Sequence, residues 1–259
     1  NIRVHLTSPE LKLVFGRHSH EENIHADSLV YMISSLGIDP YEVHAQFMDV
    51  PSVKKKIDWI TEATTSLTPD MSMSEVENKK SLAQNIFAMG LLFEGMQFYA
   101  LFGMILSLYR QNKFPGIGAM FKYTLRDESN HIELCRKLLL GLMEENPDIE
   151  RETSFLDDVQ VMTKDALEFE FAFIEDCLPQ AGLGLQAEDY KAYVLYIANR
   201  RLESIGQPTI PTFQGIKSEN RLEWLSESMD IKKEQNFFEG RVTEYQKASA
   251  LSGYSDDDL

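Results

Sequence analysis

The stretch FAMGLLFEGMQFYALFGMILSLY, residues 87–109, decides the fold of this chain. Its apolar residues cover every side of a helix, which is typical of either a membrane span or the central helix of a large bundle. Two polar residues, Glu94 and Gln97, lie well inside the stretch, and the rest of the chain is soluble in character. We therefore predict the central helix of a soluble bundle, with no membrane contact.

Glu94 is the costliest residue to bury in this helix. An ionised carboxylate in an apolar environment costs several kcal/mol unless it is paired or bound to a cation. A metal ion would satisfy Glu94, and an arginine or lysine partner is the alternative.

The sequence on both sides of this stretch predicts further helices. Thr7-Ser8-Pro9-Glu10 is typical of a helix start, and apolar periodicity then continues to a stop at Gly37. There is no convincing β alternation and no Gly-rich phosphate loop. We predict an all-α bundle over residues 1–207 and a C-terminal segment, 208–259, where the helical pattern ends. The other expected helices cover residues 40–49, 51–67, 78–111, 118–145, 148–178 and 187–205.

Composition indicates a cytoplasmic enzyme. The chain has 259 residues, 43% of them apolar, which is enough for one large domain with a substantial core. Its 41 acidic and 25 basic residues give a net charge of −16, which argues against a nucleic-acid or anionic-membrane partner. Cys135 and Cys177 are too few for a disulfide framework and are expected to be reduced thiols. No basic-then-apolar leader is visible, and the start at Asn1 suggests that an N-terminal helix is missing.

Two Glu-x-x-His pairs flank the apolar helix: Glu22 with His25, and Glu128 with His131. Positions i and i+3 lie on one helix face, so each pair can direct a carboxylate and an imidazole at one point. One pair alone would mean little, because Glu and His are common helix neighbours. Two pairs with Glu94 between them form the ligand pattern of a carboxylate-bridged two-metal site in a helical bundle.

The ligand types indicate which metals such a site would hold. Carboxylates and imidazoles without thiolates suit manganese and iron. The pattern calls for four carboxylates, whereas the sequence supplies three, so the fourth is expected from a helix before the first pair. Glu168, Glu170 and Glu175 are alternative donors, although their amphipathic helix favours the interpretation that they are solvated acids.

Six segments together resemble the radical-generating small subunit of class I ribonucleotide reductase, a ferritin-like family. They are EENIH, FEGMQFYALF, RDESNH, the DCLP…GL segment, ANRRLESIGQP and the tail NFFEGRVTEYQ, and they span nearly the whole chain. The resemblance implies metal ligands at Glu22, His25, Glu94, Glu128 and His131. It also implies a homodimer and a separate large catalytic subunit that makes deoxyribonucleotides and docks on the C-terminal tail.

The resemblance also implies a route for the oxidising equivalent. Asp127 resembles the acid that hydrogen-bonds a ligating imidazole, here His25, and that begins the transfer chain. Phe98 and Phe102 resemble the apolar wall beside the metals. Tyr245 matches the tyrosine that passes the hole across the subunit interface, with Tyr254 a weaker candidate. Arg126, Trp59 and Trp224 are expected to be structural.

Leu29 departs from the commonest family pattern, which has a radical-bearing tyrosine at this position, one turn after the first-pair histidine. Leucine cannot be oxidised to a stable radical. The chain is therefore closest to the tyrosine-lacking branch, which stores its oxidising equivalent on a manganese–iron or dimanganese centre, and a di-iron centre is the alternative. Tyr31 is either an alternative radical site or relay, or a core tyrosine with a satisfied hydroxyl.

Two other functions fit the same pattern. One is a ferritin-like di-metal oxidase of a lipid or other small molecule, which would not depend on a partner. The other is a metal-free scaffold that keeps only the fold, in which Glu94 would be paired with an arginine or lysine.

Overall fold

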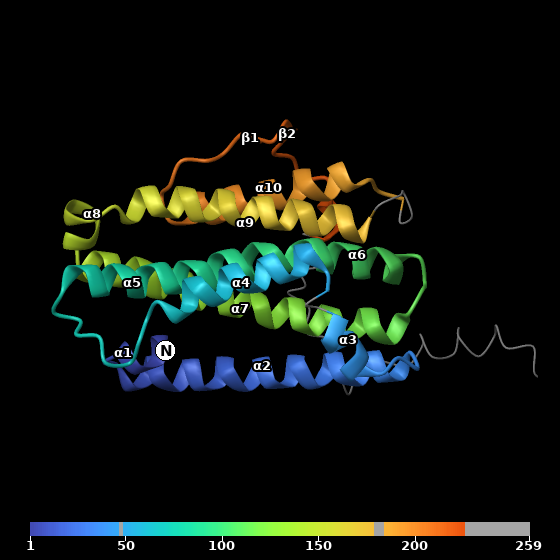
Figure 1. The fold of residues 1–259 in the computed structure, drawn as a ribbon, viewed down its shortest axis with the longest axis horizontal. Helices are drawn as coiled ribbons and strands as arrows, with labels where there is room; N and C mark the ends of the chain where they lie inside the picture. Colours follow the sequence, from blue (N-terminus) through green and yellow to red (C-terminus); the bar gives the residue numbers. More distant parts are fainter. Residues whose placement is uncertain (47–48, 179–183, 226–259) are drawn as a thin grey trace, which may run out of the picture.

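The computed structural model describes residues 1–46, 49–178 and 184–225, and in this part of the chain the fold is a helical bundle (Figure 1). Helix α2 runs along one side of the molecule and α9 and α10 along the other, with α4 to α7 between them. The helices are α1 (Ile2–His5), α2 (Pro9–Ser35), α3 (Pro40–Gln46), α4 (Pro51–Thr65), α5 (Val76–Ile86), η1 (Phe87–Gln97), α6 (Phe98–Arg110), α7 (Pro115–Glu145), α8 (Asp148–Glu152), α9 (Phe155–Cys177) and α10 (Ala187–Ser204).

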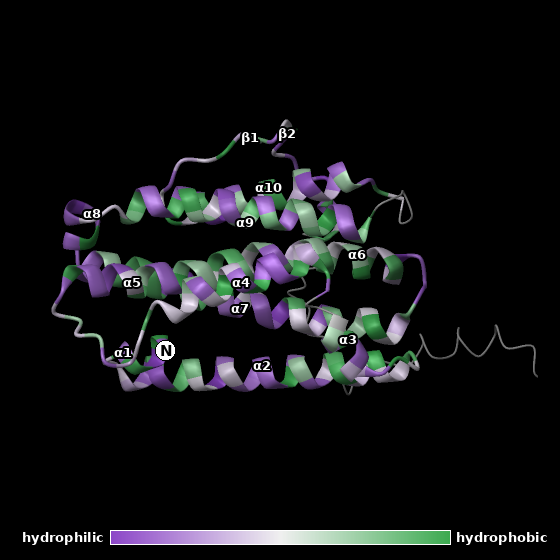
Figure 2. Cartoon of the chain, in the orientation of Figure 1, coloured by the Kyte–Doolittle hydropathy of each residue, from purple (hydrophilic) through white to green (hydrophobic). Residues whose placement is uncertain are grey.

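The apolar stretch is the central rod of the bundle, as predicted. Helices α5, η1 and α6 form one continuous helical run that contacts α4, α7, α9 and α10. The run Val76–Arg110 is long and apolar enough to cross a membrane, but 72% of its apolar window is buried inside the protein. Figure 2 shows the α6 part of this rod as mostly apolar, whereas α5 and α2 are mixed.

The middle of the rod is a π-helix, which the sequence did not predict. Segment η1 carries the buried Glu94, and its turn is wider than that of an α-helix. Segments of π-helix are rare and are frequently found at functional sites. Gly90 allows η1 to pack tightly on α7, because a Cβ there would lie 2.2 Å from the Cβ of Cys135.

Helix α2 is an edge element. It begins as predicted, with the hydroxyl of Ser8 accepting a hydrogen bond from the Leu11 amide, and the chain turns at Gly37, whose φ is +72°. Only Phe15, His18 and His25 are buried along its whole length. The surface of α2 that meets the bundle is therefore largely polar.

The C-terminal part of the described chain packs back on the bundle. The predicted helix over 148–178 is two helices, α8 and α9, divided at Thr153-Ser154. After α10 the chain forms a short antiparallel hairpin, β1 (Thr212–Phe213) with β2 (Ile216–Lys217). Within the segment 208–225, Ile210, Leu222 and Leu225 are buried in the core.

Candidate metal centre

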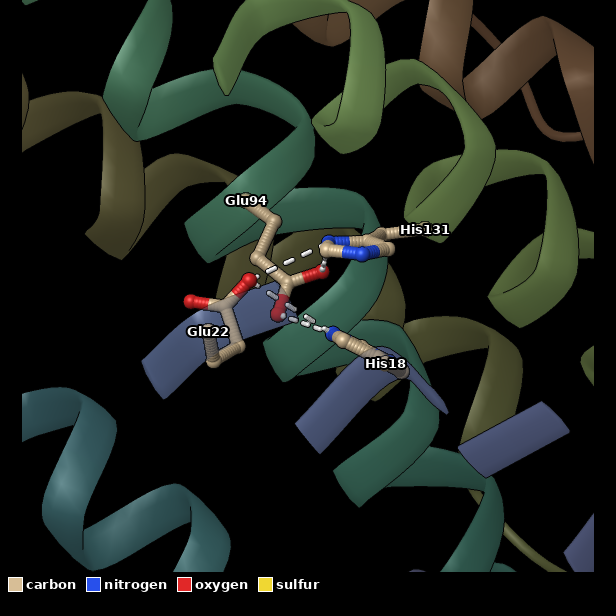
Figure 3. A group of neighbouring side chains, drawn as sticks. All are labelled: His18, Glu22, Glu94 and His131. Carbon is tan, nitrogen blue, oxygen red and sulfur yellow. Dashed lines mark hydrogen bonds and ion pairs between the residues drawn. The ribbon is translucent and has the colours of Figure 1, made fainter. Parts of the chain in front are cut away.

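Three elements direct acidic and imidazole side chains into one volume. Helix α2 contributes Glu22 and His25, η1 contributes Glu94, and α7 contributes Glu128 and His131. Figure 3 shows part of this group converging from the three elements. The structure therefore brings together all five residues that the sequence proposed as metal ligands.

Two of the carboxylates lie between the two imidazoles. Glu22 Oε1 is 3.2 Å from the Nδ1 atoms of both His25 and His131. Glu128 presents one oxygen to each ring, with Oε1 3.3 Å from His25 Nδ1 and Oε2 3.4 Å from His131 Nδ1. This is the arrangement that two bridging carboxylates would need around a pair of cations.

Glu94 lies on the His131 side of the cluster. It is fully buried, its Oε2 is 4.0 Å from His131 Nδ1, and its Oε1 accepts a hydrogen bond of 3.0 Å from His18 Nε2. Among the described residues, no arginine or lysine forms an ion pair with Glu94. The partner that the scaffold alternative requires is thus absent from this part of the chain.

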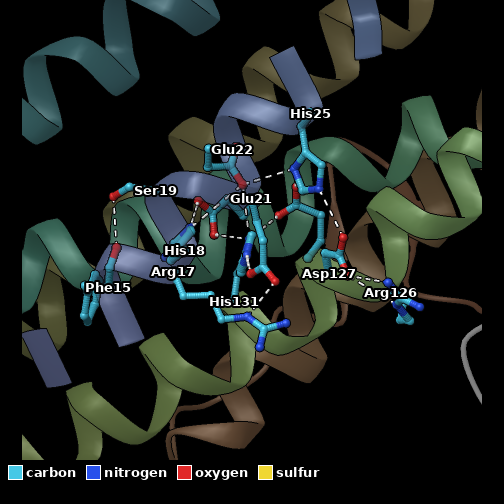
Figure 4. Close-up of polar contacts among 12 residues, drawn as sticks. Phe15, Arg17, His18, Ser19, Glu21, Glu22, His25, Arg126, Asp127 and His131 are labelled. Atoms are coloured by element: carbon cyan, nitrogen blue, oxygen red, sulfur yellow. Dashed lines mark hydrogen bonds and ion pairs between the residues drawn. The ribbon is translucent and has the colours of Figure 1, made fainter. Parts of the chain in front are cut away.

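Each inward-facing imidazole has an acid behind it. His131 Nε2 is 3.0 Å from Glu21 Oε2, and His25 Nε2 is 3.5 Å from Asp127 Oδ2 (Figure 4). Each acid is held by the arginine of its own helix: Arg17 binds Glu21, and Arg126 binds Asp127. An acid in this place fixes which ring nitrogen carries the proton and makes the other a better ligand.

The contacts between the carboxylates and the imidazoles shift the pKa values of both kinds of group. The Glu128 and Glu22 carboxylates raise the pKa of His25 to about 10. Burial opposes the protonation of His131, but the carboxylates around it, led by Glu128, raise its pKa to about 11. Burial likewise opposes the ionisation of Glu22, yet the two imidazoles lower its pKa to about 2. Burial raises the pKa of Glu94. In the metal-free protein the imidazolium groups take the place that cations would occupy, and metal binding must displace their protons.

The residues fit a pair of transition-metal ions. Four buried atoms that face the cluster have no hydrogen-bond partner: Glu94 Oε2, both carboxylate oxygens of Glu128, and His131 Nδ1. Unpartnered polar atoms at this depth are costly, which is why each needs an explanation. Carboxylate oxygens and imidazole nitrogens directed at one volume are suitable donors for manganese or iron.

The alternative carboxylates lie elsewhere. Glu170 is buried but forms an ion pair of 2.6 Å with Lys56, Glu175 pairs with Lys191, and Glu168 is exposed. None of them belongs to the two groups whose donor atoms could share a cation.

The remaining predicted residues form four groups. Phe98 and Phe102 follow Glu94 on the central rod, with ring centroids 6.2 Å apart. Leu29 is 44% exposed and Tyr31 is 71% exposed, so the interpretation of Tyr31 as a core tyrosine is wrong. Tyr245 and Tyr254 lie outside the described residues. The structural roles of Trp59 and Trp224 are supported, because both pack against the core.

The sequence analysis missed two residues of the cluster, His18 and Glu21. His18 is four residues before Glu22 and seven before His25, so all three share one face of α2. Glu21 precedes Glu22 just as Asp127 precedes Glu128, so both motifs are acid-Glu-x-x-His. Both signals were present in the sequence.

Comparisons with known proteins agree with this geometry. The family model for the ribonucleotide reductase small chain matches residues 1–238. The ribonucleoside-diphosphate reductase subunit beta of Chlamydia pneumoniae is 39% identical over 249 residues, which are 96% of this chain and 70% of that protein.

Two solved structures share the fold. A protein from Bacillus halodurans assigned as a class I ribonucleotide reductase matches with a TM-score of 0.73 and 22% identity, over 86% of this chain and 76% of that chain. The ribonucleotide reductase R2 subunit from Clostridium botulinum matches with a TM-score of 0.71 and 23% identity, over 88% and 69%. They confirm the ferritin-like helical fold. This chain therefore belongs to the ribonucleotide reductase small chain family.

Proposed function

We propose that this chain is the small subunit of a ribonucleoside-diphosphate reductase and that its cluster holds a dinuclear metal centre. The observation that carries the proposal is the convergence of two Glu-x-x-His pairs and the buried Glu94 on one volume. The relative from C. pneumoniae, a reductase subunit, supports it.

The donor atoms divide into two cation positions that share Glu22, and Glu128 also presents an oxygen to the imidazole of each position. One position is bounded by Glu22, His25 and Glu128, and the other by Glu22, Glu94 and His131, with His18 beside it. When bound, such a centre supplies one-electron oxidising power. The chain's own part is to orient the imidazole Nδ1 atoms inward and to keep a proton on each outer nitrogen.

Asp127 is proposed to begin the transfer route. Its Oδ2 faces His25 Nε2, the nitrogen that points away from the cluster. A carboxylate here can hold the imidazole proton and accept it as charge moves. Following the family resemblance, the route continues through aromatic residues to Tyr245 and then to a cysteine of the large subunit.

We further propose a manganese-containing centre, either manganese–iron or dimanganese. The support is Leu29, which occupies the position where the commonest family members carry a radical tyrosine. Without a readily oxidised side chain there, the oxidising equivalent would have to stay on the metals. A di-iron centre is the alternative.

The proposed partners are a second copy of the chain and a large catalytic subunit, in the cytoplasm. The tail beyond about residue 240 is the proposed docking element, which would bury a few apolar side chains in a groove of the large subunit. Removal of this tail should abolish binding to the large subunit while metal content and the circular dichroism spectrum stay unchanged. Normal binding by the truncated chain would contradict the tail assignment.

The decisive experiment combines metal analysis with reconstitution. The full chain, loaded anaerobically with Mn²⁺ and Fe²⁺ and then exposed to oxygen or superoxide, should contain about two metal ions per chain and show metal-centred electron paramagnetic resonance. With a large subunit it should support the reduction of a ribonucleoside diphosphate. Protein without bound metal would favour the scaffold, whereas metal-dependent oxidation of a lipid without any partner would favour the oxidase.

A further inference from the structure

We propose that His18 is itself a metal ligand, a third imidazole at the cation position bounded by Glu22, Glu94 and His131. This inference rests on the proposed function, because it needs the metal centre to exist. It assigns a direct role to a residue outside the two Glu-x-x-His pairs.

The position of His18 is the first support. It lies on the same face of α2 as Glu22 and His25, and it is only 8% exposed. Its ring stacks on that of His131, with centroids 3.9 Å apart and an interplanar angle of 27°. The two stacked rings lie side by side, so both can direct a ring nitrogen at the carboxylates. Figure 3 shows the His18 ring directed at Glu94 in this way.

The separations between donor atoms are the second support. Two atoms each about 2.1 Å from one cation lie roughly 3.0 Å apart at a right angle and roughly 4.2 Å apart when opposite. His18 Nε2 is 3.0 Å from Glu94 Oε1 and 4.0 Å from Glu22 Oε1. The predicted ligand His131 has donor separations in the same range, with Nδ1 3.2 Å from Glu22 Oε1 and 4.0 Å from Glu94 Oε2. By distance, His18 belongs to this cation position as well as His131 does.

The unpartnered buried atoms next to His18 are the third support. Glu94 Oε2 and His131 Nδ1 have no hydrogen-bond partner, so the space between them suits a cation. A third imidazole would complete that position with a neutral donor.

A competing role for His18 is a hydrogen-bond donor that only holds Glu94. The substitution His18→Gln separates the two, because a glutamine amide can still donate to Glu94 but is a poor ligand for manganese. His18→Leu removes both capacities. His20→Gln is the matched control, because His20 lies on the same helix but is exposed.

The test is pulsed electron paramagnetic resonance of Mn²⁺ bound to full-length protein that contains ¹⁵N-labelled histidine. At full loading, wild type and His20→Gln should show three directly coordinated histidine nitrogens over the two positions. His18→Gln and His18→Leu should show two, with Mn²⁺ affinity at one position reduced at least tenfold. Circular dichroism checks that each variant is folded.

The outcomes separate this inference from the function on which it rests. Two coordinated nitrogens in the wild type would overturn the ligand role of His18 while the metal centre stands. The same conclusion would follow if His18→Gln kept wild-type couplings and affinity. A wild type that binds no Mn²⁺ would overturn both the inference and the proposed function.

Discussion

Glu94 and Glu170 are both fully buried glutamates, yet the same substitution should change stability in opposite directions. Lys56 pairs with Glu170 at 2.6 Å, and its own side chain is only 12% exposed. Glu94 has His18 as its hydrogen-bond donor and two further carboxylates nearby, those of Glu22 and Glu128. The charge of Glu170 is therefore neutralised by Lys56, whereas we expect the charge of Glu94 to be neutralised by a bound metal ion.

Glu94→Gln should stabilise the metal-free protein. The amide oxygen can still accept the His18 hydrogen bond, while the cost of burying one carboxylate among others is removed. That cost is several kcal/mol for an isolated ion, and we expect the hydrogen bond from His18 to reduce it to about 2 kcal/mol. For a chain of this size, such a gain raises the Tm by about 4–8 °C.

Glu170→Gln should destabilise the same protein. It leaves the Lys56 ammonium buried without its counter-ion, a change that costs about 3–5 kcal/mol. The Lys56 Nζ lies 4.3 Å from the centre of the Phe173 ring, so we expect the lower end of that range. The Tm should fall by about 6–12 °C.

The assay is thermal unfolding by circular dichroism with a chelator and then with saturating Mn²⁺. Mn²⁺ at a hundred times its Kd adds about 2.7 kcal/mol for each site to wild type and to Glu170→Gln. Glu94→Gln should lose the Mn²⁺ stabilisation of at least one site. Its Tm should therefore be higher than that of wild type without metal and lower than that of wild type with saturating Mn²⁺. If Glu94→Gln lowers the metal-free Tm as Glu170→Gln does, then Glu94 is satisfied without a cation and the reasoning fails.

Four other predictions concern the acids behind the imidazoles, the packing at Gly90, the exposed Tyr31 and the stability of α2. Glu21→Gln and Asp127→Asn should each lower Mn²⁺ affinity by about 10–100-fold in calorimetry, because each removes the acid behind an imidazole, and an unchanged Kd would refute that role. Gly90→Ala should destabilise the fold by about 3 kcal/mol in urea unfolding, since its Cβ would overlap Cys135, whereas Gly141→Ala, with open space, should not. Tyr31→Phe should change stability by less than about 0.5 kcal/mol, and oxidised wild type should show manganese hyperfine structure without a stable tyrosyl signal. Chelation should speed amide exchange in α2 but not in α10, and equal effects would contradict the edge role of α2.

Sequence periodicity was sufficient for the parts of this fold that depend on local geometry. The spacing of Glu22 from His25 and of Glu128 from His131 fixes a helix face, and the apolar run around Glu94 fixes a central helix. The structure places all of them in one cluster.

Contacts between helices could not be predicted in the same way. The pairing of Lys56 with Glu170 joins residues 114 positions apart, and no local pattern distinguishes this buried acid from its solvated neighbours. The π-helix is a second example, because the composition of residues 87–97 does not distinguish it from an α-helix. His18 was missed for a different reason, since its helical spacing was visible but lay outside the Glu-x-x-His pattern.

The two motifs are coupled across helices, and this coupling gives α2 its place in the bundle. The acid of the α2 motif, Glu21, supports His131 on α7, and the acid of the α7 motif, Asp127, faces His25 on α2. Of the three buried residues on α2, two are the histidines His18 and His25, so little apolar burial holds this helix in place. Acidic side chains lie on both sides of this interface, and they repel one another unless cations neutralise them. Metal binding would therefore join α2 to α7 as well as build the centre. The free energy of metal binding would therefore also hold α2 against α7.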